Sequence, residues 1–199
     1  MTKKLILRLS NNLGNQMFMY ASAFALSKIL NRELFIDNET AYSDKRNIHK
    51  FDLDKFNISA QKAPSNFMFL GSIGYIKRKS LKYLDKVKTK KNFYIEPRDI
   101  NKSTSFDKNI RNGNYNDPLF VEGHFETEKY FNMFSEDIKN EFKFKNLTHF
   151  ENNGFFKDIK STESVSICIR QNRFSERKRD ITPDDEKNST IFTKDQIEY

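Results

Sequence analysis

The sequence has very little cysteine and no long apolar run, and each absence limits what the protein can be. Its one cysteine, Cys168, rules out a disulfide within the chain and fits a reducing compartment such as the cytoplasm. No stretch approaches the roughly eighteen apolar residues of a membrane-spanning helix. The apolar run after Lys3 and Lys4 ends at Arg8, which is too early for the core of a signal peptide. We therefore expect a cytoplasmic protein.

Acidic residues are also in the minority, and this sets the charge of the chain. There are 35 Lys and Arg against 27 Asp and Glu, so the formal net charge is +8. Such an excess favours an anionic partner, which could be nucleic acid, a membrane surface or a phosphorylated small molecule. The alternative is that Lys, Asn, Ile and Phe are common here because A+T-rich codons encode them. With 199 residues, of which 37% are hydrophobic, the chain is long enough to form a globular core.

The first 37 residues predict a strand, a helix and a second strand. Leu5–Leu9 is typical of a buried strand, Asn15–Leu30 has apolar residues at helical spacing, and Glu33–Asp37 is again strand-like. Such a unit implies two parallel strands and an α/β fold. The polar turn Asn11–Gln16 follows the first strand, and the carboxyl ends of strands are where α/β proteins bind ligands.

The remaining elements are predicted with less regular spacing. Short strands are expected at residues 93–95 and 119–125, a helix at 128–144, and a strong strand at Ser164–Arg170. The polar residues 152–154 suggest a boundary between an N-terminal lobe, residues 1–151, and a second region, residues 152–199. We find no internal repeat.

The segment Ser72–Lys91 predicts a basic amphipathic helix. Five apolar side chains share one face, eight cations occupy much of the rest, and Asp85 is the single acid. One interpretation is that this helix lies on an anionic membrane or contacts phosphates. The other is a solvated helix that covers the core.

The turn after the first strand carries the most specific pattern in the chain. It lacks the G-x-G-x-x-G and P-loop patterns, so by itself it is a helix start whose free N–H groups suit an anion or a hydroxyl. The string Leu13-Gly14-Asn15-Gln16-Met17-Phe18-x-Tyr20-Ala21 resembles the N-terminal signature of glycosyltransferase family 11, the α-1,2-fucosyltransferases. Three further segments resemble later landmarks of that family in order and spacing, namely residues 32–37, 51–58 and 123–131.

A second hallmark of the family is a strand ending in an arginine that contacts the donor diphosphate. Arg170 keeps that arginine, whereas Cys168, Gln171 and Arg173 depart from the family pattern. A guanidinium at a strand end can hold phosphate oxygens bidentately and offset charge on a leaving nucleoside diphosphate without a metal. Arg173 would add positive charge there, and the alternative roles are an ion pair for Arg170 and a solvated loop position for Arg173.

The resemblance implies the Rossmann-like lobe of a GT-B glycosyltransferase, with the second lobe incomplete. The implied reaction transfers L-fucose from GDP-fucose to the 2-hydroxyl of a galactoside glycan with inversion. Gly14, Asn15 and Gln16 would shape the cleft wall, with Gly14 allowing close approach of the backbone. His124 and Glu126 are candidates for the general base. Family members continue with a C-terminal lobe, so residues 1–199 alone are expected to bind GDP-fucose weakly and to transfer little.

No metal or cofactor is expected. Asp52-Leu53-Asp54 has the spacing of metal-using glycosyltransferases, but no strongly apolar strand precedes it, and we interpret it as a packing landmark. The three histidines are too scattered for zinc. The rival hypothesis is a non-catalytic basic protein that binds an anionic polymer or a membrane surface. In the enzyme hypothesis no nucleic acid partner is expected, and peripheral membrane contact would run through Ser72–Lys91.

Overall fold

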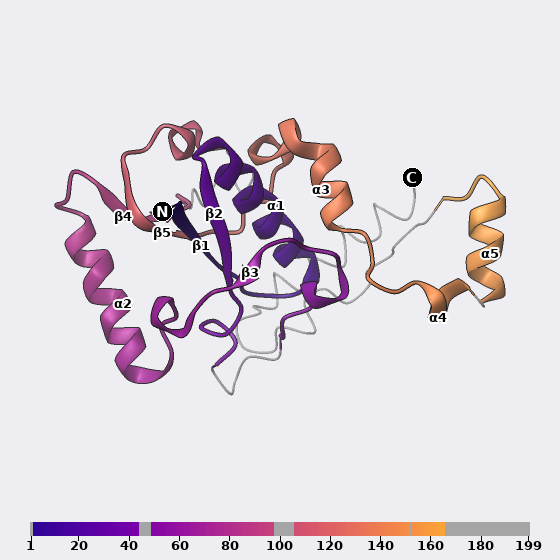
Figure 1. Ribbon diagram of the computed structural model, residues 1–199, viewed down its shortest axis with the longest axis horizontal. Helices are drawn as coiled ribbons and strands as arrows, with labels where there is room; N and C mark the ends of the chain where they lie inside the picture. The colour runs from indigo at the N-terminus through magenta and orange to yellow at the C-terminus, as the bar shows by residue number, and fades with distance from the viewer. Residues whose placement is uncertain (1, 44–48, 98–105, 152, 166–199) are drawn as a thin grey trace, which may run out of the picture. The chain divides into compact units, whose positions relative to one another are not determined.

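The computed structural model describes residues 2–43, 49–97, 106–151 and 153–165. The chain divides into two compact units, Met1–Leu147 and Thr148–Tyr199. The lobe boundary expected at residues 152–154 stays a prediction. Within its described part, the first unit is built on a parallel sheet (Figure 1) with the strand order β3-β2-β1-β5-β4. The strands are β1 (Lys3–Arg8), β2 (Arg32–Asp37), β3 (Gln61–Lys62), β4 (Lys91–Ile95) and β5 (Tyr115–Glu122).

Helices connect and flank these strands. The first unit contains α1 (Leu13–Ile29), α2 (Gly71–Asp85) and α3 (Ser135–Glu141), together with the short 3-10 turns η1 (Leu53–Lys55), η2 (Ser65–Phe67), η3 (Lys108–Arg111), η4 (Glu128–Tyr130) and η5 (Asn132–Phe134). The described part of the second unit contains α4 (Thr148–Glu151) and α5 (Gly154–Ser161). The chain is therefore an α/β protein with a Rossmann-like arrangement of parallel strands.

The predicted strand–helix–strand unit is confirmed. β1 and β2 pair in parallel from Lys3 opposite Arg32 to Arg8 opposite Asp37, and α1 connects them. Asn12 caps the helix with a side chain that accepts from the backbone N–H of Asn15. Helical periodicity between two strand-like runs was enough to predict this unit, because two strands joined by one helix through short connections pair in parallel.

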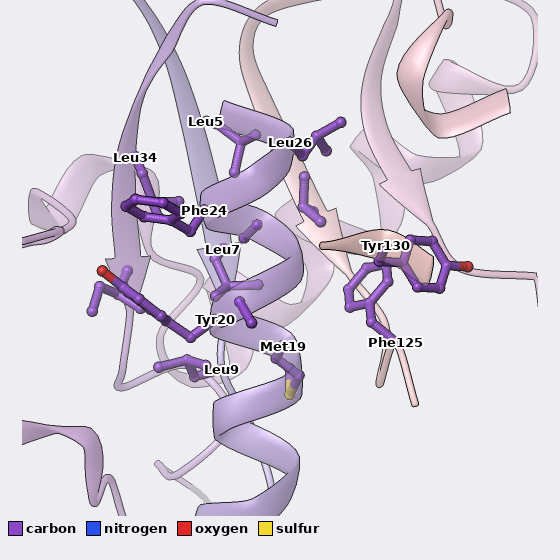
Figure 2. Packing of buried hydrophobic residues seen from close by; sticks show 14 of the residues in the cluster. Leu5, Leu7, Leu9, Met19, Tyr20, Phe24, Leu26, Leu34, Phe125 and Tyr130 are labelled. Atoms are coloured by element: carbon purple, nitrogen blue, oxygen red, sulfur yellow. The ribbon is translucent and has the colours of Figure 1, made fainter. Parts of the chain in front are cut away.

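The sheet buries apolar side chains on both faces. Leu5 and Leu7 of β1, and Leu9 just after it, face α1, where Tyr20 and Phe24 pack against them (Figure 2). Tyr20 also donates from its hydroxyl to Glu141 Oε2 of α3, at 2.5 Å. On the opposite face lies a smaller cluster made of Ile6, Phe35, Ala63 and Met68. Covered on both faces, β1 is the rigid centre from which the adjoining turn projects.

Arg32 fixes the amino end of the sheet. Its guanidinium is largely buried and donates to the carbonyl oxygens of Lys4 at 3.1 Å, Asn116 at 2.8 Å and Tyr115 at 3.2 Å. Because these carbonyls belong to β1 and β5, one side chain of β2 ties three strands together. This arginine therefore has a structural role, and the ligand-facing edge lies at the other end of the strands.

Two sequence predictions need correction. The helix predicted over 128–144 is broken into η4, η5 and α3, because Phe131 adopts a non-helical backbone (φ −137°, ψ 0°). Tyr130 turns into the core against Phe125 instead of continuing a surface stripe. The strand predicted over 119–125 is β5, which ends at Glu122, where a turn begins. The strand predicted at Ser164–Arg170 ends outside the described residues.

Candidate functional site

The carboxyl ends of the parallel strands form the ligand-facing edge of the sheet. The chain leaves β1 toward β2 and returns on the other side of β1 as β4 and β5. Such a change of direction is where open α/β sheets bind ligands. A pocket of about 240 Å³ lies at this edge, and its lining includes Arg8, Ser10, Arg78, Glu96, Glu122 and His124.

The turn between β1 and α1 is shaped by its asparagines. Asn11 has a left-handed backbone (φ 64°), a conformation that asparagine tolerates better than most residues. The hydroxyl of Tyr42 donates to the carbonyl oxygen of Asn11 at 3.2 Å, and this contact supports the turn. Burial, followed by the charge of Asp52, raises the pKa of Tyr42, so its hydroxyl keeps its proton as a donor.

Gln16, which was expected on the cleft wall, is completely buried. Its amide nitrogen donates to the carbonyl oxygens of Asn11 at 2.8 Å and Lys50 at 2.7 Å, and its amide oxygen accepts from the N–H of Asp52 at 2.9 Å. The side chain thus joins the turn to residues 50–52, just before η1. Leu53, part of the predicted packing landmark, is the first residue of η1 and is also fully buried. Gln16 shapes the site by holding the backbone.

Gly14 and Asn15 lie on the outer side of the same turn. Gly14 is exposed, and a Cβ built there would meet no atom within 4 Å. Asn15 is half-buried, and its N–H donates to the side chain of Asn12 at 3.4 Å. The protein itself therefore does not require glycine at residue 14, and the space beside it is open.

The turn after β5 brings His124 to the turn after β1. Nδ2 of Asn11 lies 3.0 Å from Nε2 of His124, across 113 positions of sequence. When the amide nitrogen is the donor, Nε2 accepts, and the ring proton lies on Nδ1, which faces Glu126 Oε1 at 3.6 Å. Both side chains are partly exposed, at 35% and 44%. This group can accept a proton from a hydroxyl that displaces Asn11.

Glu96 holds the His124 turn in a strained shape. Phe125 is fully buried with a left-handed backbone (φ 54°), which is costly for a bulky residue. Glu96 Oε2 accepts from the backbone N–H groups of His124 at 2.7 Å and Phe125 at 2.9 Å. A Cβ on Gly123 would lie 2.5 Å from Glu96 Cβ, so glycine is needed for that carboxylate to approach. The turn that Glu96 holds in this way brings the side chains of His124 and Glu126 next to each other, with Nδ1 of His124 3.6 Å from Oε1 of Glu126.

The two glycines of the site should respond oppositely to alanine. Gly123→Ala collides with Glu96, and we expect it to lower the free energy of unfolding by roughly 1–3 kcal/mol. Gly14→Ala meets open space inside a helix and should leave it unchanged or raise it by up to about 1 kcal/mol. Urea unfolding followed by circular dichroism measures both. Equal stability of the two variants would contradict this account of the turn.

A second group of the pocket is strongly charged. Glu122, at the end of β5, accepts from Arg78 Nε at 2.8 Å, from a second nitrogen of Arg78, and from Lys82 Nζ at 2.6 Å. Arg8 NH1 of β1 lies 3.9 Å from Glu122 Oε2. Burial would raise the pKa of Glu122, but Arg78 and Lys82 outweigh it and hold that pKa below its usual range. One carboxylate thus faces three cations.

Arg8 is the functional candidate that sequence reasoning missed. Burial, and then the neighbouring Arg78, lower its pKa, and its Nε is buried with no hydrogen-bond partner among the residues that the structure describes. The one sequence feature that could have identified it is a charged residue at the end of an otherwise apolar strand. The lining of the pocket carries two cations, Arg8 and Arg78, and two carboxylates, Glu96 and Glu122. The Nε of Arg8 is thus a buried donor at the pocket that an anionic ligand could use.

Arg170 and Arg173 lie outside the described residues. In the part of the chain that the structure describes, no three His, Cys, Asp or Glu side chains group together to hold a metal. Asp52 instead accepts from Lys55 Nζ at 2.8 Å. Within the same ranges, no helix is long and apolar enough to cross a membrane.

The fold and the site define an α/β chain with a polar pocket at the carboxyl edge of a parallel sheet. No family model, curated protein or solved structure matches it. An α/β sheet of this kind supports many activities, so function has to be argued from the residues at its edge.

Proposed function

We propose that this chain is the N-terminal lobe of a GT-B glycosyltransferase that transfers L-fucose from GDP-fucose to the 2-hydroxyl of a galactoside, with inversion. The observation that carries the proposal is the meeting of Asn11 and His124, whose side chains lie 3.0 Å apart. The turn Asn11–Gln16 and the segment 123–131 resemble two landmarks of one fucosyltransferase family. Their convergence at the ligand-facing edge supports a shared catalytic role.

The proposed chemistry uses His124 as the general base. The acceptor oxygen attacks the anomeric carbon of fucose, the bond to the diphosphate breaks, and the hydroxyl proton passes to Nε2 of His124. Glu126 faces Nδ1 and would stabilise the imidazolium that forms. The acceptor hydroxyl would replace Asn11 as the partner of Nε2.

In the proposed reaction, the cations stabilise the leaving group. GDP departs with additional negative charge on its diphosphate, which positive groups in a partly dry site stabilise. Arg170 is the proposed diphosphate ligand from the sequence, and Arg8 is a further cation at the sheet edge. The proposed reaction needs no metal, because guanidinium groups can supply the charge.

Calorimetry with GDP-fucose tests the proposal. The unchanged chain should bind GDP-fucose, weakly, and incubation at high protein concentration with lactose should yield a small amount of fucosylated product. Gly14→Leu should fold normally, because open space surrounds Gly14, yet it should lose binding by filling the cleft wall. Arg170→Ala should lose the calorimetric signal as well.

Matched controls make the result decisive. Gly154→Leu makes the same substitution at another exposed glycine with open space around it, outside the predicted strand that carries Arg170, and should bind GDP-fucose like the unchanged chain. GDP-mannose should bind through the same diphosphate without yielding product. Absence of both GDP-fucose binding and transfer by the unchanged chain would reject the proposed function.

A further inference from the structure

Helix α2 is oriented with its apolar side outward, the reverse of an ordinary helix at a protein surface. Its half-buried or buried side is made of Gly74, Arg78, Leu81, Lys82 and Asp85, spaced three or four residues apart. Most amphipathic helices place their apolar stripe on the core and their charges in water. Two things therefore have to be explained: which contacts hold the polar side of α2 against the protein, and what covers its exposed apolar side.

The inner side of α2 is fixed by polar contacts and one close approach. Arg78 and Lys82 bind Glu122, and the carboxylate of Asp85 accepts from the backbone N–H groups of Asn92 at 2.8 Å and Phe93 at 2.9 Å. A Cβ on Gly74 would lie 2.3 Å from the backbone of Phe69, so glycine permits the tight packing. These contacts leave no freedom to turn the apolar stripe inward.

The outer side of α2 exposes an apolar stripe that is interrupted only by the small side chain of Ser80. Ile73, Ile76, Tyr83 and Leu84 are exposed to 84%, 62%, 71% and 51%, and Val87, just beyond the helix, to 86%. Figure 1 shows α2 running beside β4, with the sheet on one side of it. Side chains of this size are rarely gathered on a protein surface that has no partner.

Cations border the stripe on both sides. Lys77 lies along one edge and Lys79 and Lys86 along the other, all exposed, and Lys88 and Lys90 follow in the next turn. The single acid of the segment, Asp85, is buried, so its charge does not face outward. An apolar stripe between rows of lysine complements a surface that is anionic at its face and apolar beneath it.

We propose that α2 docks in the plane of an anionic lipid bilayer, with its apolar stripe inserted between the headgroups. The apolar side chains would leave water for the acyl boundary, while the lysines would reach the lipid phosphates. Arg78 of this helix lines the pocket at the carboxyl edge of the sheet, and Lys82 binds Glu122 in its lining. Docking would therefore hold that edge close to the membrane. Vesicle binding needs no nucleotide sugar, so this proposal stands apart from the proposed reaction.

Two other partners fit the surface less well. In a symmetric pair of chains, the lysine rows of one copy would face those of the other without exposed acids between them, which is unfavourable. A nucleic acid would meet the lysines but would leave Ile73, Ile76 and Val87 against its phosphates. The apolar stripe is therefore the feature that separates a membrane from either alternative.

Co-sedimentation with vesicles tests the docking. The full chain should bind vesicles of phosphatidylcholine with one third phosphatidylglycerol and bind pure phosphatidylcholine much more weakly. Replacing Ile76 and Val87 by serine should weaken binding by roughly tenfold or more. Replacing Lys77, Lys79 and Lys86 by glutamine should weaken it roughly a hundredfold. The matched control is Val165→Ser, an equally exposed valine outside α2.

A fluorescence reporter separates insertion from simple charge attraction. The chain has no tryptophan, so Tyr83→Trp supplies a single emitter on the stripe, and its emission should shift to the blue on anionic vesicles. Unchanged vesicle binding by the Ile76/Val87 variant, or no spectral shift, would overturn the proposal. It would equally be overturned by a concentration-dependent dimer that the same variant abolishes, or by binding to single-stranded RNA in preference to vesicles.

Discussion

Replacing Glu122 by leucine is expected to lower the free energy of unfolding by about 3–5 kcal/mol. The carboxylate is 9% exposed and is held by Arg78 and Lys82, with Arg8 nearby. Leucine preserves much of the volume but leaves these cations facing one another in a partly buried site. Removal of one partner from such a cluster costs far more than the cluster contributes as a whole, because the remaining charges stay desolvated.

Urea unfolding monitored by circular dichroism measures this effect. Glu39→Gln is the matched control, because Glu39 pairs with Lys62 while both side chains are about half exposed, and it should change stability by less than about 1 kcal/mol. A Glu122→Leu variant within that same range would show that the cluster does not hold β5 and α2 together.

The pH dependence gives an independent check on the same cluster. Because the cations hold the pKa of Glu122 below its usual range, the folded state binds fewer protons than the unfolded state near that range. This contribution to stability is complete above the ordinary glutamate pKa, about 4.3, and is lost as the pH falls through the lower folded pKa. Glu122→Gln should therefore show a shallower loss of stability below about pH 4.3 than the unchanged chain.

Local patterns predicted the centre of the fold but not the orientation of α2. The strand β1 and helix α1 follow from residues a few positions apart, since Leu5, Leu7 and Leu9 alternate and the helix has its own period. The period of α2 likewise revealed an amphipathic helix. Which side packs inward depends on Glu122, some forty residues later in the chain and paired with Arg78 and Lys82, and no local pattern contains that contact.

The sequence predicted where the candidate site lies, but it predicted only some of the residues that form it. The carboxyl end of the first strand was predicted from the break at Asn11, and parallel topology makes it the ligand-facing edge. Gln16 was expected to face a ligand, but its amide is taken up by three backbone groups. That burial depends on residues 50–52 folding back over the turn, a long-range contact that spacing does not encode.

Replacing His124 by glutamine is expected to lower kcat for fucosyl transfer by about 10²–10⁴-fold, the usual contribution of a general base. Glutamine can still accept the hydrogen bond from Asn11 but cannot take up a proton. The fold should persist, because the backbone N–H of His124, not its ring, is what Glu96 holds. Glu126→Gln should reduce kcat less, since it removes only the partner that faces Nδ1.

The measurement is product formation from GDP-fucose and lactose by the full chain at high protein concentration, with urea unfolding in parallel. Glu128→Gln, an exposed carboxylate in the same segment, is the control and should keep the full rate. A large fall in kcat with little change in KM for lactose separates proton acceptance from acceptor binding, because a group that acts in the transition state leaves ground-state binding nearly intact. Full activity of His124→Gln would exclude this histidine as the base, even if transfer itself were observed.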